Sequence, residues 1–240
     1  MTDQQANETT VWGEIDGQTI TFPMRVPAMD AATLLFTVPA AAATSLLPGD
    51  AFEVVEVGEG LAQFVLALCD YKDNPWGNYL EINLGFLARP AGAPEDLIGS
   101  FVYRMPVDQA FTCEAGNRVM GFPKTVEDLS RTDVDGRVTF AMSKNGESVL
   151  SVSFPAVPAA GDPVPVESVS YSYLDGVPFE TPLELEMGSG IVDPGEVTIE
   201  LGAGPIADEL RTLGVPRRPD MVTWGTGLSG TFQMGQPVTG

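Results

Sequence analysis

Lys124 is the residue of this 240-residue chain whose neighbours best suit covalent chemistry. It directly follows the apolar segment 119–123, in which Gly121 permits close backbone approach and Pro123 fixes the direction of the chain. An amine held within such a segment loses its contact with water, and desolvation favours the neutral form of an amine. A neutral lysine amine can attack a ketone and form an imine, also called a Schiff base. The alternative interpretation is a surface lysine in a turn, which polar surroundings favour for the other two lysines.

Glu81 is the acidic residue that the sequence pattern singles out. Apolar residues at the even positions of segment 80–86 alternate with Tyr79, Glu81 and Asn83, and in a strand the two sets face opposite sides of the sheet. Glu81 is therefore either a solvated carboxylate on an exposed face or a carboxylate that faces a pocket. In a pocket it could orient a substrate or shuttle protons.

The composition excludes several other kinds of chemistry. The chain has no histidine, which removes Ser-His-Asp and Cys-His nucleophile pairs, imidazole bases and every His-containing metal site. Its two cysteines, Cys69 and Cys113, are too few for a structural zinc site, and the apolar run around Cys69 indicates a buried thiol. We therefore expect no metal site.

The charge of the chain limits its partners. It has 12 Lys and Arg against 33 Asp and Glu, a formal net charge of −21. This surplus repels phosphates and anionic lipid surfaces, so we expect neither a nucleic-acid nor a membrane partner. Residues 1–10 are polar and acidic and show no secretory signal, which predicts a disordered tail and a cytoplasmic protein with reduced thiols.

The elements that must position these residues are mostly strands. Alternation predicts strands over 79–86 and 169–173, and the pair Asn145-Gly146 predicts a hairpin of 138–143 with 149–154. We expect helices over 40–47 after Pro39, over 108–115 between Asp108 and Gly116, and over 206–213. This content predicts a mainly β (α+β) fold, a closed barrel or curled sheet around a pocket, with residues 11–240 as one domain. Further strands are expected near 52–57, 61–70, 98–104, 183–187 and 197–201.

The segment Glu114–Lys124 resembles the lysine loop of the acetoacetate decarboxylase family. That loop typically reads Gly, two variable or charged residues, a short apolar stretch, then Phe/Tyr-Pro-Lys. Three weaker blocks follow the family in the same order along the chain, and the resemblance covers roughly residues 20–235. These blocks are Phe36 through Leu46-Leu47-Pro48, then Tyr79-Leu80-Glu81, then Gly204-Pro205-Ile206.

The resemblance implies a closed, cone-shaped antiparallel β-barrel with a few short helices and the lysine at the base of an apolar pocket. It implies a carboxy-lyase without a cofactor, which decarboxylates acetoacetate or a related small β-keto acid through an imine at Lys124. Acetoacetate decarboxylase is itself a known case of a lysine activated by its surroundings. The resemblance also implies a homo-oligomer. The residues it points to are Lys124 and Glu81 for catalysis, and Arg25, Met120, Phe122 and Arg118 for substrate binding.

Several positions depart from the family pattern. Thr125 stands where decarboxylating members carry a second lysine, and no arginine lies near Met29, so Arg25 is the nearest candidate for holding a carboxylate. A family glutamate expected within 64–66 is also missing. Arg118 follows the position where the family has an arginine, and we interpret it first as a helix C-terminal cation and second as a pocket group. These departures leave open an aldolase or dehydratase on a larger keto acid, and a non-catalytic barrel that binds a small molecule or acts as an oligomeric scaffold.

Overall fold

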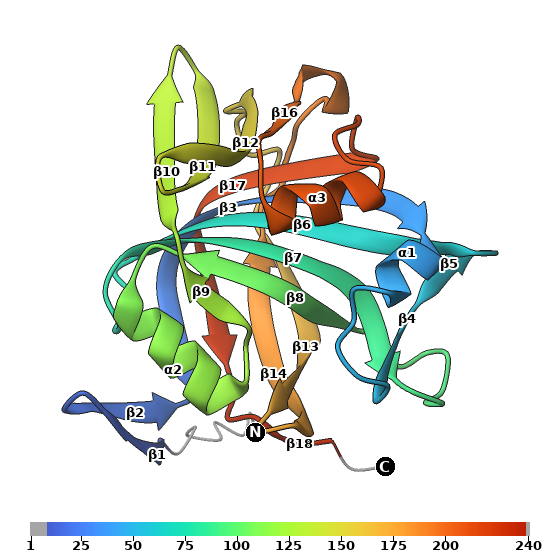
Figure 1. The fold of residues 1–240 in the computed structure, drawn as a ribbon. Helices are drawn as coiled ribbons and strands as arrows, with labels where there is room; N and C mark the ends of the chain where they lie inside the picture. The colour runs from blue at the N-terminus through green and yellow to red at the C-terminus, as the bar shows by residue number, and fades with distance from the viewer. Residues whose placement is uncertain (1–8, 239–240) are drawn as a thin grey trace.

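Seven long strands close into a β-barrel in the computed structural model, which describes residues 9–238 (Figure 1). Strand β17 pairs with β3 on one side and with β14 on the other, and this second pairing closes the barrel. The barrel strands, in their order around the barrel, are β3 (Met24–Pro39), β6 (Leu61–Lys72), β7 (Tyr79–Pro90), β8 (Gly99–Val107), β13 (Val164–Leu174), β14 (Val177–Met187) and β17 (Met221–Phe232).

One barrel pairing differs from the predicted antiparallel arrangement. Strands β8 and β13 run parallel, with Ser170 opposite Ser100 and Tyr171 opposite Phe101, whereas the other barrel neighbours are antiparallel. A parallel pair needs a long crossover connection. The chain supplies one here, because it leaves the barrel after β8 and returns only at β13.

That crossover supplies three of the four strands of a second sheet on the outside of the barrel. In Figure 1 this outer sheet stands above β17, β3 and β6, and α3 lies beside it. Apolar side chains of both layers share one buried cluster, which includes Phe140 and Phe154 from the outer sheet and Phe64 and Phe86 from the barrel. The outer sheet consists of β10 (Asp128–Val134), β11 (Arg137–Lys144), β12 (Glu147–Pro155) and β16 (Thr198–Leu201), and α3 is Pro205–Thr212.

Shorter elements complete the described part of the chain. A hairpin of β1 (Thr10–Ile15) and β2 (Gln18–Phe22) covers one end of the barrel, where its buried Ile20 joins the cluster that holds Tyr71 and Trp76. None of the helices within residues 9–238 has the length and apolar composition needed to span a bilayer. The remaining elements are α1 (Ala40–Thr44), α2 (Ala110–Met120), the 3-10 turn η1 (Pro194–Glu196), β4 (Phe52–Val54), β5 (Glu56–Gly58), β9 (Lys124–Val126), β15 (Gly190–Ile191) and β18 (Gln236–Pro237).

The hairpin at Asn145-Gly146 is confirmed, with both turn residues at positive φ as a two-residue hairpin turn requires. The predicted helix 108–115 was placed wrongly. Helix α2 begins after Gln109, whose side chain caps it, and ends at Gly121, where φ is 65°. The predicted tail of residues 1–10 lies mainly outside the described residues, and its last member, Thr10, begins β1.

A network of charged side chains joins the outer sheet to the barrel. Arg131 Nη1 on β10 lies 2.7 Å from Asp30 Oδ2 on β3 and 2.7 Å from Asp70 Oδ2 on β6. Lys72 also pairs with Asp30, and the Gly227 N–H donates to Asp30 Oδ1 at 3.0 Å. Burial alone raises the pKa of Asp30, but the hydrogen bonds from Lys72 and Arg131 outweigh it, so the pKa is lowered overall.

The substitution Asp30→Asn is expected to destabilise the protein by about 3 kcal/mol at pH 7. This is the low end of the range for breaking a buried ion pair, and we expect the low end because Arg131 still pairs with other carboxylates. The folded-state pKa of Asp30 lies below its unfolded value of about 3.9, so its carboxylate stabilises the fold above that pH. This stabilisation is lost as the pH falls further. Urea unfolding at pH 7 and pH 3 should show a difference between wild type and variant that shrinks at pH 3.

Asp133 provides the matched control for this prediction. It also pairs with Arg131, at 2.8 Å, but its side chain is 57% exposed. An exposed pair contributes little, so Asp133→Asn should change the free energy of unfolding by less than about 1 kcal/mol. If Asp30→Asn and Asp133→Asn lowered the free energy of unfolding by the same amount, the buried pair would not be the more stabilising one.

Candidate active site

A buried ion pair forms the centre of the candidate site. Lys124 Nζ lies 2.7 Å from Glu81 Oε2, and the two side chains are only 5% and 4% exposed. Lys124 is the first residue of β9 and Glu81 lies near the start of β7, so residues far apart in sequence meet inside the barrel. The interpretation of Glu81 as a solvated carboxylate is therefore wrong, and so is that of Lys124 as a surface lysine.

The end of α2 determines where Lys124 lies. Gly121 takes the left-handed conformation that ends the helix, and an added Cβ there would lie 2.4 Å from the Tyr173 carbonyl oxygen. The chain then turns at Phe122 and Pro123 and enters β9, which pairs in parallel with β8 through Lys124 and Met105. Glycine is required at this turn for both its conformation and its lack of a side chain.

Asn117 fixes the backbone of Lys124 from both sides. Its Oδ1 accepts a hydrogen bond from the Lys124 N–H at 2.8 Å, and its Nδ2 donates to the Lys124 carbonyl at 3.1 Å. A side-chain amide carries a donor and an acceptor, so one residue can satisfy both groups of a neighbouring peptide. Nothing in the local sequence pattern predicted this role of Asn117.

The side chain of Lys124 lies along one face of α2. A Cβ added at Gly116 would lie 2.7 Å from both Cδ and Cε of the lysine, so only glycine leaves room for it. One turn earlier on the same face, Thr112 Oγ1 accepts a hydrogen bond from Lys124 Nζ at 3.3 Å. The amine also lies 5.1 Å from the ring centre of Tyr79. Gly116 and Thr112 were missed from sequence, although their four-residue spacing placed them on one helix face.

The other carboxylate oxygen of Glu81 accepts hydrogen bonds from two neutral donors. Its Oε1 accepts hydrogen bonds from the Tyr71 hydroxyl at 3.2 Å and from Asn83 Nδ2 at 3.0 Å. Burial, reinforced by the charge of Glu81, raises the pKa of the Tyr71 and Tyr79 hydroxyls well above the usual value. The same causes raise the pKa of the neighbouring Cys69 thiol. These three groups therefore stay protonated at neutral pH.

The ion pair borders a cavity of about 420 Å³ inside the barrel. Met120 and Phe122, predicted to bind substrate, both line this cavity beside Lys124. The inward-facing positions of β7 line it too, while the apolar even positions of 80–86 pack outward beneath the outer sheet. Within residues 9–238, no three His, Cys, Asp or Glu side chains come together to hold a metal ion.

The two arginines predicted to bind substrate lie outside the cavity. Arg25 is exposed on β3, because its neighbour Met24 faces the cavity and adjacent strand residues face opposite sides. Arg118 is exposed on α2 and pairs with Glu114 at 2.8 Å, which agrees with its interpretation as a helix C-terminal cation. Thr125 faces away from the barrel and is also exposed.

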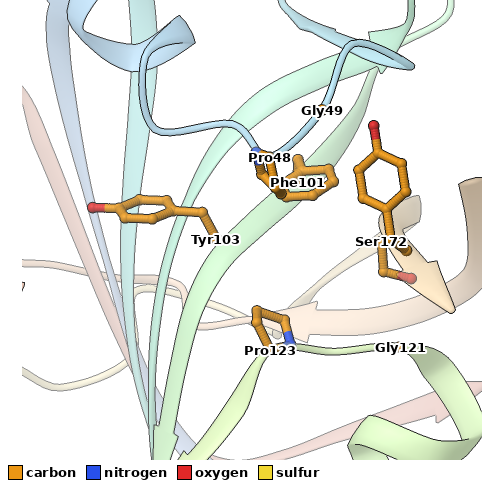
Figure 2. Close-up of a pocket in the computed structure, with 8 residues that line it drawn as sticks. Pro48, Gly49, Phe101, Tyr103, Gly121, Pro123 and Ser172 are labelled. Atoms are coloured by element: carbon orange, nitrogen blue, oxygen red, sulfur yellow. The ribbon is translucent and has the colours of Figure 1, made fainter. Parts of the chain in front are cut away.

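A second cavity, of about 450 Å³, lies behind the lysine loop (Figure 2). Pro48 and Gly49 border it on one side and Gly121 and Pro123 on the other, and Lys124 is not among the residues that line it. The hydroxyl of Ser172 in its wall donates to the Met120 carbonyl at 2.6 Å. This hydrogen bond fixes the last residue of α2 from the side of the second cavity.

Comparison with known proteins finds one matching family model and several solved structures with a similar fold. The family model described as Acetoacetate decarboxylase (ADC) matches residues 14–229. A solved structure of an acetoacetate decarboxylase has a TM-score of 0.65 at 14% identity, covering 90% of this chain and 89% of that chain. The acetoacetate decarboxylase of Legionella pneumophila has a TM-score of 0.62 at 16% identity, with 90% and 87% covered.

A third similar structure is the enduracididine biosynthesis enzyme MppR, complexed with the condensation product of pyruvate and imidazole 4-carboxaldehyde. Its TM-score is 0.54 at 18% identity, and the match covers 88% of this chain and 87% of that chain. No curated protein matches the sequence. At these identities, the three solved structures show that the chain shares their fold.

Proposed function

Since this chain belongs to the acetoacetate decarboxylase family, we propose that it is a lyase that forms an imine between Lys124 and the carbonyl carbon of its substrate. The observation that carries the proposal is the buried lysine amine 2.7 Å from a buried carboxylate, beside a largely apolar cavity. Imine formation requires a neutral lysine amine and a group that both accepts and returns a proton. The absence of histidine from the chain is compatible with this chemistry.

Glu81 is proposed to move the protons. Its Oε2 can accept a proton from Lys124 Nζ, and the neutral amine then attacks the ketone to give a carbinolamine. Glu81 returns a proton to the departing hydroxyl, water leaves, and a protonated imine remains on Lys124. The hydrogen bonds from Tyr71 and Asn83 keep the Glu81 carboxylate in position through these steps.

Decarboxylation of a β-keto acid is the first candidate reaction, because it needs no further protein group. The bond between the α-carbon and the carboxylate breaks and its electron pair enters the protonated imine. Carbon dioxide leaves, and an enamine remains on Lys124. A proton returned to the α-carbon regenerates the imine cation, and water hydrolyses it to the ketone and free Lys124. This proton comes from solvent, because Glu81 is again a carboxylate once the imine has formed. Glu81 lies beside Lys124 Nζ, so it can take up the proton and pass it to the α-carbon.

Aldol chemistry is the second candidate, and one observation favours it. Among residues 9–238, Lys124 is the only cationic side chain that lines the cavity, so no separate cation positions the carboxylate that a β-keto acid must lose, whereas the carbonyl substrate of an aldol reaction need not carry one. The same enamine can attack an aldehyde instead of taking a proton, and loss of water then gives a dehydrated product. MppR, whose structure holds a condensation product of pyruvate and an aldehyde, shares the fold. A small keto acid as substrate, a homo-oligomer and a cytoplasmic location also remain proposals.

Borohydride trapping tests the proposal. Incubation with acetoacetate or pyruvate followed by borohydride should add a permanent mass to the peptide that contains Lys124, because borohydride reduces an imine to a stable amine. Release of carbon dioxide from acetoacetate decides between the two reactions. If no keto acid gives an adduct at any pH from 5 to 9, the chain is a non-catalytic binding protein and the proposal fails.

A further inference from the structure

We propose that the substrate is held mainly by a hydrocarbon tail lying along the barrel, and not by a carboxylate. The ligand class is thus a carbonyl compound with a medium-length alkyl chain, with or without an acid group. This inference rests on the proposed imine at Lys124 and names the substrate of that site. It rests on the length of the cavity, the residues that line it and the charges within it.

The cavity extends far beyond the ion pair. On β7 the lining residues continue from Glu81 through Gly85 to Leu87, six residues or about 20 Å along the strand. Strand register places Val65 and Leu35 at the level of Gly85, so the neighbouring strands line the same outer stretch. At about 30 Å³ for each water molecule, 420 Å³ holds about 14 waters, more space than acetoacetate occupies.

The two ends of the cavity differ in exposure. Near the ion pair, Met29, Tyr71 and Trp76 are at most 7% exposed, and the β1–β2 hairpin covers this end. At the level of Gly85, Met221 is paired in register with Leu35 and is 40% exposed. A carbonyl group bonded to Lys124 therefore has its remaining atoms directed along the apolar stretch toward Met221.

The charges in the cavity do not attract a substrate carboxylate, so a keto acid accepted here is held by its other atoms. Of the described residues that line it, only Lys124 is cationic, whereas Glu81 and Glu186 are carboxylates, which makes the formal charge −1. Glu186 is held in place by the N–H and hydroxyl of Ser229, at 2.7 and 3.0 Å. A substrate carboxylate would add a second uncompensated negative charge, while an alkyl tail buries apolar surface at every carbon.

A series of methyl ketones tests the role of the tail. Acetone, 2-pentanone and 2-heptanone all form the same kind of imine and differ only in their CH₂ groups. The ketone concentration that gives half-maximal borohydride adduct at Lys124 should fall about fourfold for each added CH₂, or about 250-fold over the four CH₂ groups that separate 2-heptanone from acetone. Equal values for all three ketones would overturn the inference while leaving the imine intact, and no adduct with any of them would overturn the proposed function itself.

The role of charge is tested with a matched pair, 4-oxononanoate and its methyl ester, neither of which is a β-keto acid. The ester should form the adduct at least fivefold more readily than the acid. A preference for the acid would show that a carboxylate is recognised after all, contrary to the inference.

A variant of the outer cavity separates tail binding from imine chemistry. Val65→Phe narrows the cavity at the level of Gly85, away from Lys124, and should lower the ratio of 2-heptanone to acetone trapping about tenfold. Val65→Ala, the matched control, should leave this ratio the same or raise it. If Val65→Phe lowers trapping of both ketones equally, the tail does not lie along this stretch.

Discussion

Replacement of Lys124 by methionine is expected to abolish the borohydride adduct and to lower any lyase activity on the order of 10⁴-fold or more. Methionine keeps an unbranched apolar side chain of similar length but cannot form an imine, so the covalent route is lost entirely. Loss of an enzyme's nucleophile typically has effects of this size or larger. Mass spectrometry of the trapped protein and steady-state kinetics measure the two effects.

The same variant should be less stable, because it leaves the Glu81 carboxylate buried without its cation. Removal of one partner of a buried ion pair destabilises a protein by about 3–5 kcal/mol. The double variant Lys124→Met/Glu81→Gln removes both charges and should recover most of this loss while remaining inactive. Urea unfolding of the single and double variants thus separates a folding defect from a catalytic one.

Lys144 is the matched control for the lysine replacement. It pairs with Glu127 at 3.0 Å on the surface, and its side chain is 61% exposed. Lys144→Met should leave both the adduct at Lys124 and the free energy of unfolding nearly unchanged. A surviving adduct in Lys124→Met that maps to another lysine would refute the assignment of Lys124.

The substitution Gly116→Ala is expected to remove most of the activity while leaving the protein folded. An added Cβ would lie 2.7 Å from Cδ and Cε of Lys124, and the flexible lysine side chain moves more easily than the helix. Alanine favours a helix interior over glycine by about 0.5–1 kcal/mol, so helix α2 itself gains stability. A displacement of about 1 Å at a reacting group can cost a factor of about 100 in rate.

The measurement for Gly116→Ala compares the initial rate of adduct formation with the midpoint of urea unfolding. We expect a rate lower by about 100-fold and a midpoint equal to or above that of the wild type. Glu114→Ala on the exposed face of the same helix is the control, and it should leave the rate unchanged. A wild-type rate in Gly116→Ala would show that the placement of the Lys124 side chain on α2 is not needed for the reaction.

Local patterns were sufficient for the lysine loop and for most strands. The turn at Gly121 and Pro123 needs residues with special backbone conformations, and such residues are visible in any sequence. The alternation of apolar residues with other residues in 79–86 likewise shows that this strand has two different faces. Helix α2 was misplaced because Gly116 was interpreted as a stop, whereas it lies inside the helix to leave space for Lys124.

Other features depended on contacts between distant segments. Arg25 was chosen by its nearness to a family position, but the alternation of β3 directs its side chain away from the cavity. Asn117 acts through two hydrogen bonds to a backbone seven residues later, which only the folded loop brings within reach. Alternation does not say which face of β3 is enclosed, and no local pattern places the Asn117 side chain beside the Lys124 backbone.

The sequence by itself singled out the residue that we propose carries the chemistry, since Lys124 stands in a loop whose apolar and turn residues are contiguous in the chain. Only the tertiary structure decided that Glu81 is its partner. Alternation defines two faces of a strand without saying which one is enclosed, and the apolar face of β7 is the outer one because a second sheet covers it. The physical reason is that enclosure comes from barrel closure between β14 and β17 and from the packed outer sheet, both of which join segments distant in sequence.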